Sequence, residues 1–325
     1  MKKILLVALA AAGMVSCSQN EEIENAGQKA EIRFSTVVKN GTRAVINDNN
    51  NFSEFTVCGY KTADVMADGV QLASGFMDNV NVTKSDNTWS TATTFYWPAT
   101  GKVQFFATYP AQTLDITSAG YPKFDYKVGA IDAQVDLVAA KVLDKDKTAA
   151  GITLPFQHLL TQVNFSIKGD LAGCTYKLTK LELSNLNDNG SFQFTSATDG
   201  VGGTWTLGSA TANLKYTYEK TSGVEVIPTA DLSDAVALEE DGKALFMLLP
   251  QDASGIKANI TYTATPGDGS EGFSGTKEVT LTKTWNPSMK VRYTLLLTSD
   301  RKPITFEEPT FGTWTEASDA IDSGK

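Results

Sequence analysis

Side chains able to perform acid–base or nucleophilic chemistry are sparse in this sequence of 325 residues. It contains one histidine, His158, so a Ser-His-Asp or Cys-His arrangement would have to use that residue. The residues around it, Phe156, Leu159 and Leu160, are apolar. We therefore predict that His158 is a packed or hydrogen-bonded residue at the start of a strand and not a catalytic base.

Acidic pairs and cofactor motifs lead to the same prediction. Glu239-Glu240 and Glu307-Glu308 are adjacent and point to opposite faces of a strand, whereas a glycosidase needs two facing carboxylates about 5–10 Å apart. The sequence has no Cys-x-x-Cys, no Gly-x-x-x-x-Gly-Lys-Ser/Thr, and no Gly-x-Gly-x-x-Gly between a strand and a helix. The net charge of -9 disfavours nucleic-acid partners. We expect no enzyme activity, no cofactor and no metal site.

Tryptophans and cysteines have a structural interpretation. The five tryptophans could stack on sugars, but they are spread over the chain and embedded in strand patterns, which favours the core; they are Trp89, Trp97, Trp205, Trp285 and Trp314. Cys58 and Cys174 lie far apart in the sequence, and Cys58 belongs to an alternating apolar segment. We predict buried free thiols, with a disulfide between the two as the alternative.

The first 30 residues have the pattern of an export signal and a tether. Lys2 and Lys3 precede an apolar run over residues 4–15, which is too short to span a bilayer. The run ends in Met14-Val15-Ser16-Cys17-Ser18, which resembles a bacterial lipobox. We expect residues 1–16 to be a lipoprotein signal peptide and Cys17 to carry palmitate-type acyl chains. The alternative is an ordinary cleaved signal with an incidental cysteine.

The residues after Cys17 are polar and acidic. Ser18-Gln19-Asn20-Glu21-Glu22 resembles the tether signals that send lipoproteins to the outer cell surface of some Gram-negative bacteria. A plain solvated linker is compatible with the same composition. We expect residues 17–30 to be a flexible tether that holds the protein at the cell outer membrane.

Apolar and polar residues alternate along most of the remaining chain, which predicts strands. In residues 31–39, Ile32, Phe34, Thr36 and Val38 share one face. We expect hairpins at the Pro98–Gly101 turn and at Asn187-Asp188-Asn189-Gly190. Only residues 232–240 and 133–142 have a helix-like pattern.

Many short strands separated by turns are typical of β-sandwiches. About 290 ordered residues are too many for one sandwich of about 100 residues, so we expect an all-β fold with two sandwiches in tandem. A boundary near Ala149-Ala150-Gly151 gives an N-terminal domain of residues 31–150 and a C-terminal domain of residues 151–325.

Several short sequence motifs are more informative in their order and spacing than any one of them alone. They are the lipobox at Cys17, Gly41-Thr42-Arg43-Ala44, residues 55–60, residues 96–110, residues 154–163, residues 248–251, Trp285, residues 293–295, residues 304–306 and Trp314. Together they resemble the fimbrillin family, the subunits of type V pili, over nearly the whole chain. The resemblance implies two transthyretin-like β-sandwich domains, export as a lipoprotein, and proteolysis after an arginine near the N-terminus.

Carried over to this chain, the resemblance places the cut between Arg43 and Ala44, by an arginine-specific protease. The cut releases the strand over residues 31–39, whose inward residues are Ile32, Phe34 and Val38. A strand from another pilus subunit, either a second copy or a related fimbrillin, then fills the vacated groove. The alternative is that Arg43 is an ordinary loop residue.

The end of the chain has the pattern of a donor strand. Residues 303–314 are short and apolar on one face, with Ile304, Phe306, Phe311 and Trp314 as the apolar residues. The alternative is that they form the last strand of their own domain. We therefore expect a non-enzymatic structural or adhesive pilus subunit at the cell surface. A surface lipoprotein that binds glycan or protein ligands and does not polymerise is the alternative.

Overall fold

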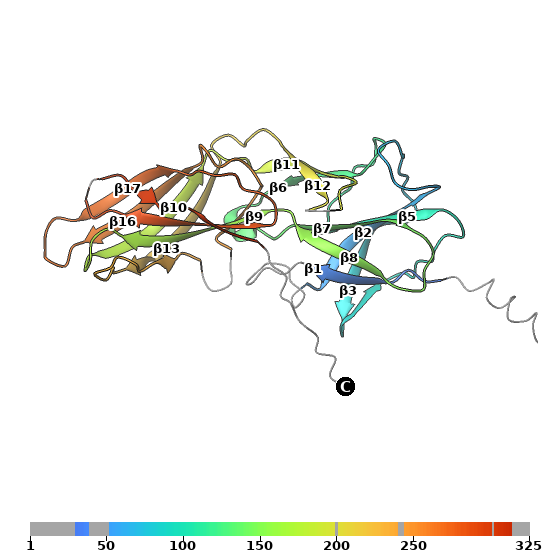
Figure 1. Ribbon diagram of the computed structural model, residues 1–325, viewed down its shortest axis with the longest axis horizontal. Helices are drawn as coiled ribbons and strands as arrows, with labels where there is room; N and C mark the ends of the chain where they lie inside the picture. The colour runs from blue at the N-terminus through green and yellow to red at the C-terminus, as the bar shows by residue number, and fades with distance from the viewer. Residues whose placement is uncertain (1–29, 39–51, 199–200, 240–243, 301, 314–325) are drawn as a thin grey trace, which may run out of the picture.

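The computed structural model describes residues 30–38, 52–198, 201–239, 244–300 and 302–313. These residues form strands β1 to β20 and one 3₁₀ turn, η1 (Ile131–Ala133), with no α-helix among them. The fold is all-β, which confirms the prediction from the alternating pattern. The molecule is elongated, with the earlier strands at one end and most of the later strands at the other (Figure 1). In the described ranges, no helix is long and apolar enough to cross a membrane.

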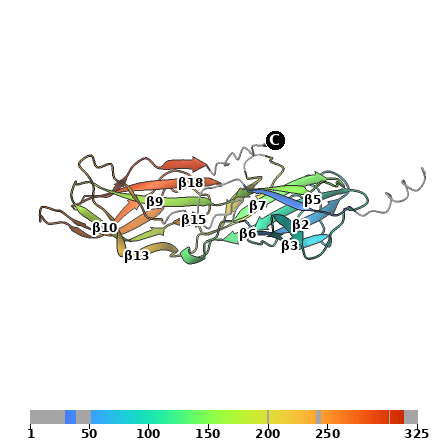
Figure 2. The same cartoon turned by 90° about the horizontal axis from the view of Figure 1, so that it is seen from below.

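The N-terminal sheet has seven strands in the order β1-β8-β7-β5-β2-β3-β4. They are β1 (Phe34–Val38), β2 (Glu54–Thr62), β3 (Met77–Ser85), β4 (Thr88–Thr91), β5 (Lys102–Tyr109), β7 (Val138–Lys145) and β8 (Ile152–His158). Figure 2 labels four of them, β2, β3, β5 and β7. Neighbouring strands are antiparallel except β1 and β8, which run parallel. The strand at one edge of this sheet is therefore β1.

Most of the later strands form two sheets that share one buried core. One sheet has the order β13-β10-β16-β17, and the other has the order β14-β9-β18-β19, with β15 on β9 and β20 on β18. Their bounds are β9 (Thr161–Gly169), β10 (Thr175–Ser184), β13 (Lys215–Val226), β14 (Val236–Ala237), β15 (Phe246–Leu248), β16 (Lys257–Thr265), β17 (Phe273–Thr280), β18 (Met289–Leu297), β19 (Thr305–Phe306) and β20 (Thr310–Thr313). This arrangement is sandwich-like.

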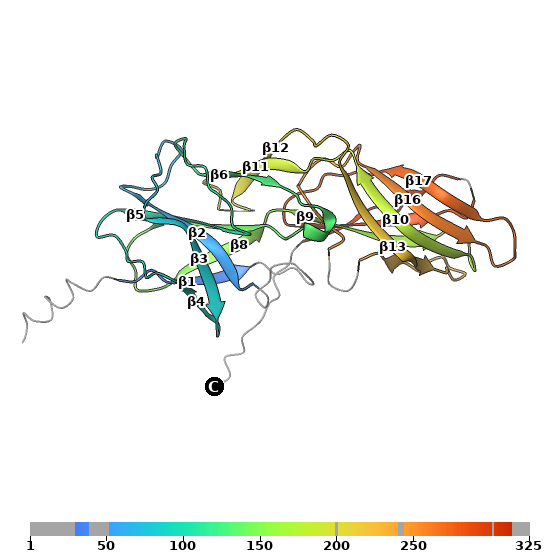
Figure 3. The ribbon, with the colours of Figure 1, turned by 180° about the vertical axis from the view of Figure 1, so that it is seen from behind.

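A third, small sheet joins the two ends of the molecule. Its order is β12-β11-β6, with β6 (Lys123–Lys127), β11 (Asn189–Phe194) and β12 (Gly203–Leu207) (Figure 3). The early strand β6 thus pairs with the late strand β11. Phe106 of β5 and Phe194 of β11 also meet, with ring centroids 5.0 Å apart. The two ends of the molecule therefore share part of their core.

The chain passes from one end of the molecule to the other later than the expected boundary at 150/151. Strand β8, which begins at Ile152, pairs with β1 and β7 in the N-terminal sheet. The change of sheet comes between His158, the end of β8, and Thr161, the start of β9. The division into two domains stays a prediction, since β6 and β11 pair across it.

The two helix predictions are wrong over the residues described. In residues 133–142 the chain leaves η1 at Ala133 and enters β7 at Val138. Val138 and Ala140 pack in one core cluster and Ala139 in the other, so β7 is buried on both faces. A strand buried on both faces has a continuous apolar run, which alternation cannot identify. In residues 232–239 the chain forms β14 instead of a helix.

The two hairpin predictions are also wrong. The Asn187–Gly190 turn connects β10 to β11, and these strands belong to different sheets. Strand β5, which follows the Pro98–Gly101 turn, pairs with β2 and β7. The turn residues predict where the chain reverses, but the pairing of strands depends on contacts far apart in the sequence.

Candidate functional site

Strand β1 lies on β8 in parallel register along its whole length. The pairs run from Phe34 opposite Ile152 to Val38 opposite Phe156. Ile32 and Phe34 are buried, with 4% and 8% exposure, whereas Val37 on the other face is 45% exposed. The strand thus has one apolar face against the core, as the alternation predicts.

The ring of Phe34 fills an aromatic pocket. It meets Phe55 edge-on with centroids 6.1 Å apart and Phe105 edge-on with centroids 5.6 Å apart. Trp97 packs edge-on against Phe105 at 5.9 Å. Such edge-to-face pairs stabilise a core beyond the area that they bury. The side chain of Val38 lies outside the part of the chain that the structure describes.

The residues just before β1 are hydrogen-bonded on both sides. The Ile32 N–H donates to the Phe95 carbonyl (2.8 Å), and the Trp97 N–H donates to the Ala30 carbonyl (2.9 Å). On the other side, the Ile152 N–H donates to the carbonyl of Arg33 (2.7 Å). Removing residues 30–38 would therefore open a slot between residues 95–97 and β8, and not only a bare edge.

Strand β8 depends on β1 for most of its pairing. It pairs with β7 only at two positions, Val138 opposite His158 and Ala139 opposite Gln157, against five positions with β1. Beyond these two pairs β7 and β8 separate, and a cleft lined by Val142 and Pro155 lies between them. Loss of β1 would leave both edges of β8 largely unpaired, which favours the addition of a strand.

The C-terminal segment is folded against its own chain. Strands β19 and β20 both pair antiparallel with β18. Ile304 is 3% exposed, and Phe306 meets Tyr293 edge-on with centroids 5.5 Å apart. Phe311 is 42% exposed. In this conformation the segment adds two short strands to β18 of its own chain.

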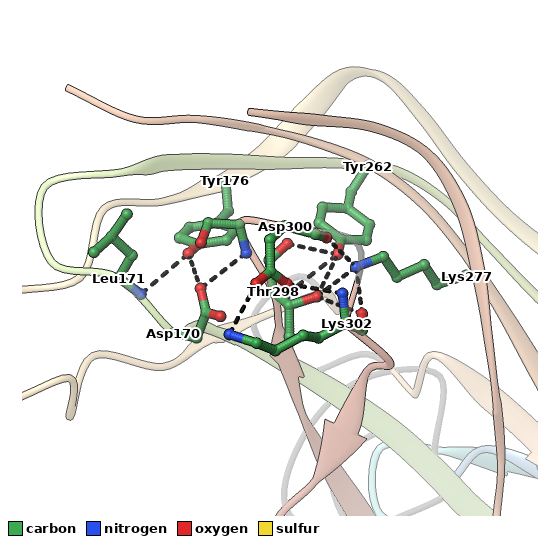
Figure 4. A network of polar contacts seen from close by, with 9 residues as sticks. Asp170, Leu171, Tyr176, Tyr262, Lys277, Thr298, Asp300 and Lys302 are labelled. Carbon is green, nitrogen blue, oxygen red and sulfur yellow. Dashed lines mark hydrogen bonds and ion pairs between the residues drawn. The ribbon is translucent and has the colours of Figure 1, made fainter. Parts of the chain in front are cut away.

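A network of polar contacts holds the turn that precedes this segment (Figure 4). Lys277 on β17 donates from its ammonium to the Asp300 carbonyl (2.6 Å) and to the Lys302 carbonyl (2.6 Å). The same ammonium donates to the hydroxyl of Thr298. Within the turn, the Lys302 N–H donates to the Asp300 carboxylate (2.8 Å). One lysine from the facing sheet therefore fixes the start of the C-terminal segment.

The other side of the turn is joined to the loop before β10. The Asp170 carboxylate accepts hydrogen bonds from the Ser299 N–H (2.9 Å) and from the Tyr176 hydroxyl (2.5 Å). Burial, together with this carboxylate, raises the pKa of Tyr176 above its usual range. The Tyr262 hydroxyl donates to the Thr298 carbonyl (2.8 Å). Side chains from one sheet, and Asp170 directly after β9 of the other, thus hold the turn (Figure 4).

The residues considered for catalysis have structural surroundings. His158 is fully buried, and its Nδ1 lies 2.8 Å from a carboxylate oxygen of Asp136. Cys58 and Cys174 are buried free thiols, as predicted, and burial raises the pKa of both. Among the described residues, no three His, Cys, Asp or Glu side chains form a group that could hold a metal ion.

The tryptophans that the structure describes do not form an exposed row. Trp97 and Trp285 are buried, with 6% and 1% exposure. Trp89 and Trp205 are half-buried, and the indole N–H of Trp205 donates to the Leu159 carbonyl (3.0 Å). This arrangement matches the core interpretation for these four residues.

Some of the predicted site residues lie outside the described ranges, namely Cys17, Arg43, Ala44 and Trp314. Of the others, Phe34 lies on β1 and Ile32 two residues before it, while Phe306 lies on β19 and Ile304 directly before that strand. The sequence pattern did not indicate that β8, residues 95–97 or Lys277 belong to the candidate site. Lys277 contacts residues 21–25 positions away, and no local pattern signals such contacts.

The family model described as fimbrillin-like matches residues 42–314. A fimbrial protein from Bacteroides vulgatus ATCC 8482 has a similar structure, with a TM-score of 0.63, 19% identity, and coverage of 88% of this chain and 99% of that chain. A protein described as a "putative cell adhesion protein" from Bacteroides ovatus ATCC 8483 has a TM-score of 0.51 and 15% identity, and the coverage is 88% of this chain and 98% of that chain. No curated protein matches in sequence. Since the family model spans most of the chain, the protein belongs to the fimbrillin-like family.

Proposed function

We propose that this protein is a non-enzymatic structural or adhesive subunit of a cell-surface pilus and that its copies are joined by strand exchange. The observation that carries the proposal is the position of β1, an edge strand with a buried apolar face that is paired in parallel with β8. Membership of the fimbrillin-like family supports a pilus or adhesion role. In this proposal, cleavage between Arg43 and Ala44 frees β1.

Loss of β1 exposes apolar surface that a replacement strand can cover again. Ile32 and Phe34 are buried, and burial of such a side chain contributes about 1.5–3 kcal/mol, or about 3–6 kcal/mol for the two. The net stability of a whole domain is about 5–15 kcal/mol. A cleaved subunit would therefore gain much from a replacement strand. Such a strand would restore both the apolar contacts and the hydrogen bonds of the Ile152 and Trp97 N–H groups.

The C-terminal segment of another copy is the proposed replacement strand. It is short, it alternates, and it is attached through a turn at the outer end of the molecule. In the described conformation it is folded back, which keeps a subunit monomeric. Before cleavage, acylation of Cys17 would hold the exported subunit at the outer membrane, so that cleavage acts as the assembly switch.

Assembly can be tested by trimming the purified protein with an arginine-specific protease and following its size by sedimentation. An Arg301→Lys background keeps the protease from removing the C-terminal segment. We expect the trimmed chain to polymerise, and a matched chain ending at Lys302 to stay monomeric after the same treatment. Arg43→Ala is the control for the position of cleavage and should stay intact and monomeric. A trimmed chain that remains a stable monomer contradicts the proposal.

A further inference from the structure

We propose that residues 303–308 of a second copy replace β1 in one specific register, parallel to β8. Ile304 takes the place of Ile32, and Phe306 takes the place of Phe34. This inference rests on the proposed function and goes beyond it, because it assigns each donor residue to a position in the acceptor.

The two segments share the same short pattern. Glu31-Ile32-Arg33-Phe34 and Pro303-Ile304-Thr305-Phe306 each place an isoleucine two residues before a phenylalanine. Both isoleucines are buried, with 4% and 3% exposure. Both phenylalanine rings pack edge-on against aromatic neighbours, with centroids 5.5–5.6 Å apart in the closest pairs. The donor therefore carries the two side chains that the pocket loses.

Other registers place an unsuitable residue at a buried position. Shifting the donor by two residues in one direction brings Lys302 to the site of Ile32, and the opposite shift brings Glu308 to the site of Phe34. Burying an unpaired charge there is unfavourable. A shift by one residue turns the apolar side chains to the solvent. A register with Phe311 at the site of Phe34 brings Pro309 to the site of Ile32. The N–H at that site donates to the Phe95 carbonyl, and proline has no N–H to replace it.

The backbone also fits the proposed register. The antiparallel bridge to residues 95–97 uses the Ile32 N–H and the Ala30 carbonyl, so a proline is tolerated between them at the position of Glu31. Pro303 falls at that position. At the other end, Pro309 falls at the position of Val37, where the missing N–H interrupts the ladder. The paired stretch is therefore residues 303–308.

The direction in which the donor strand would enter the slot, and the length that it can span, both agree with this register. The turn before the segment lies at the outer end of the C-terminal sheets, bonded to Asp170. Strand β1 enters the N-terminal sheet at the opposite end of the molecule and runs toward the middle (Figures 1 and 3). With two copies end to end, a donor leaving one tip enters the next copy in the direction of β1. At about 3.3 Å per residue, residues 303–308 extend about 20 Å, which is enough to reach along the slot.

Disulfide cross-linking tests the register. Ser35 and Thr153 touch through their hydroxyls at 2.9 Å on the exposed face, and the register puts Glu307 at the position of Ser35. We therefore combine Thr153→Cys with Glu307→Cys in one chain, trim it, let it assemble and oxidise it. Trimming removes Cys17, and the remaining native cysteines are buried. The matched controls combine Thr153→Cys with Thr305→Cys or Pro309→Cys, which shift the thiol by two residues in either direction.

We expect a ladder of covalent multimers from the Glu307→Cys chain, at least ten times stronger than from either control, because a disulfide needs Cα atoms about 4.4–6.8 Å apart. A ladder that is strongest for a control, or equal in all three, overturns the register while leaving strand exchange in place. Absence of polymer by sedimentation for the trimmed chain without engineered cysteines overturns the proposed function, and the register with it.

Discussion

The buried ring of Phe34 holds β1 against the core of the N-terminal sheet. It is 8% exposed and packs against two aromatic rings, whereas Val37 on the same strand is 45% exposed. Because truncating a buried phenylalanine costs about 3–5 kcal/mol, we expect Phe34→Ala to lower the free energy of unfolding of the uncut chain by about 3 kcal/mol. Val37→Ala, the matched control, should cost about 0.5 kcal/mol or less. Denaturant unfolding measures both, and equal effects would contradict the packing of Phe34.

Lys141, at the edge of the cleft between β7 and β8, should make the stability of the fold depend on pH. Its ammonium donates to the carbonyls of Thr195 and Gly202, and burial lowers its pKa to about 8. Between that value and the ordinary pKa of about 10.4, the unfolded chain binds the proton that the folded chain has lost. The stability of the natural chain relative to Lys141→Met should therefore rise as the pH increases from about 8 to about 10.

The measurement is the difference in unfolding free energy between the two chains at several pH values. Taking the difference cancels the other groups that titrate in this range. A difference that stays constant, or that falls with rising pH, would contradict the burial of Lys141.

At the scale of the strand, local sequence patterns predict where a strand lies and which face is buried better than they predict which strand it pairs with. The alternation at Ile32 and Phe34 predicts which face of β1 is buried, and the structure agrees. The sequence did not indicate that β8 lies beside it, since more than a hundred residues separate the two strands. For the same reason the Asn187–Gly190 turn predicts a reversal of the chain but not that β10 and β11 belong to different sheets.

The hydrogen bonds of Lys277 should determine how firmly the C-terminal segment is held. Its ammonium donates to three oxygens of the turn at residues 298–302, and hydrogen bonds from a charged donor contribute about 1.5–3 kcal/mol each when well formed. We expect Lys277→Met to speed hydrogen exchange of the amides in β19 and β20 at least tenfold. Lys257→Met, which removes only an exposed ion pair with Glu278, should leave it within twofold. Equal exchange in the two variants would contradict the role of Lys277.

At the scale of the whole molecule, the two ends are less separate than the sequence indicates. The prediction of an all-β fold needs only composition and alternation, both of which are local. The shared sheet of β6, β11 and β12, and the contact between Phe106 and Phe194, depend on the path of the chain in space. The elongated shape places the slot for β1 and the turn before the C-terminal segment at opposite ends, which suits assembly end to end (Figure 1).

Hydrogen exchange at the Ile152 amide tests strand exchange most directly, because in the uncut chain this N–H donates to the Arg33 carbonyl at 2.7 Å. We predict that the amide is protected in the uncut chain, exposed in a trimmed chain that ends at Lys302 and cannot donate a strand, and protected again in the polymer of the trimmed full-length chain. Protection that persists in the trimmed monomer, or that does not return in the polymer, would contradict the replacement of β1 by a strand from another copy.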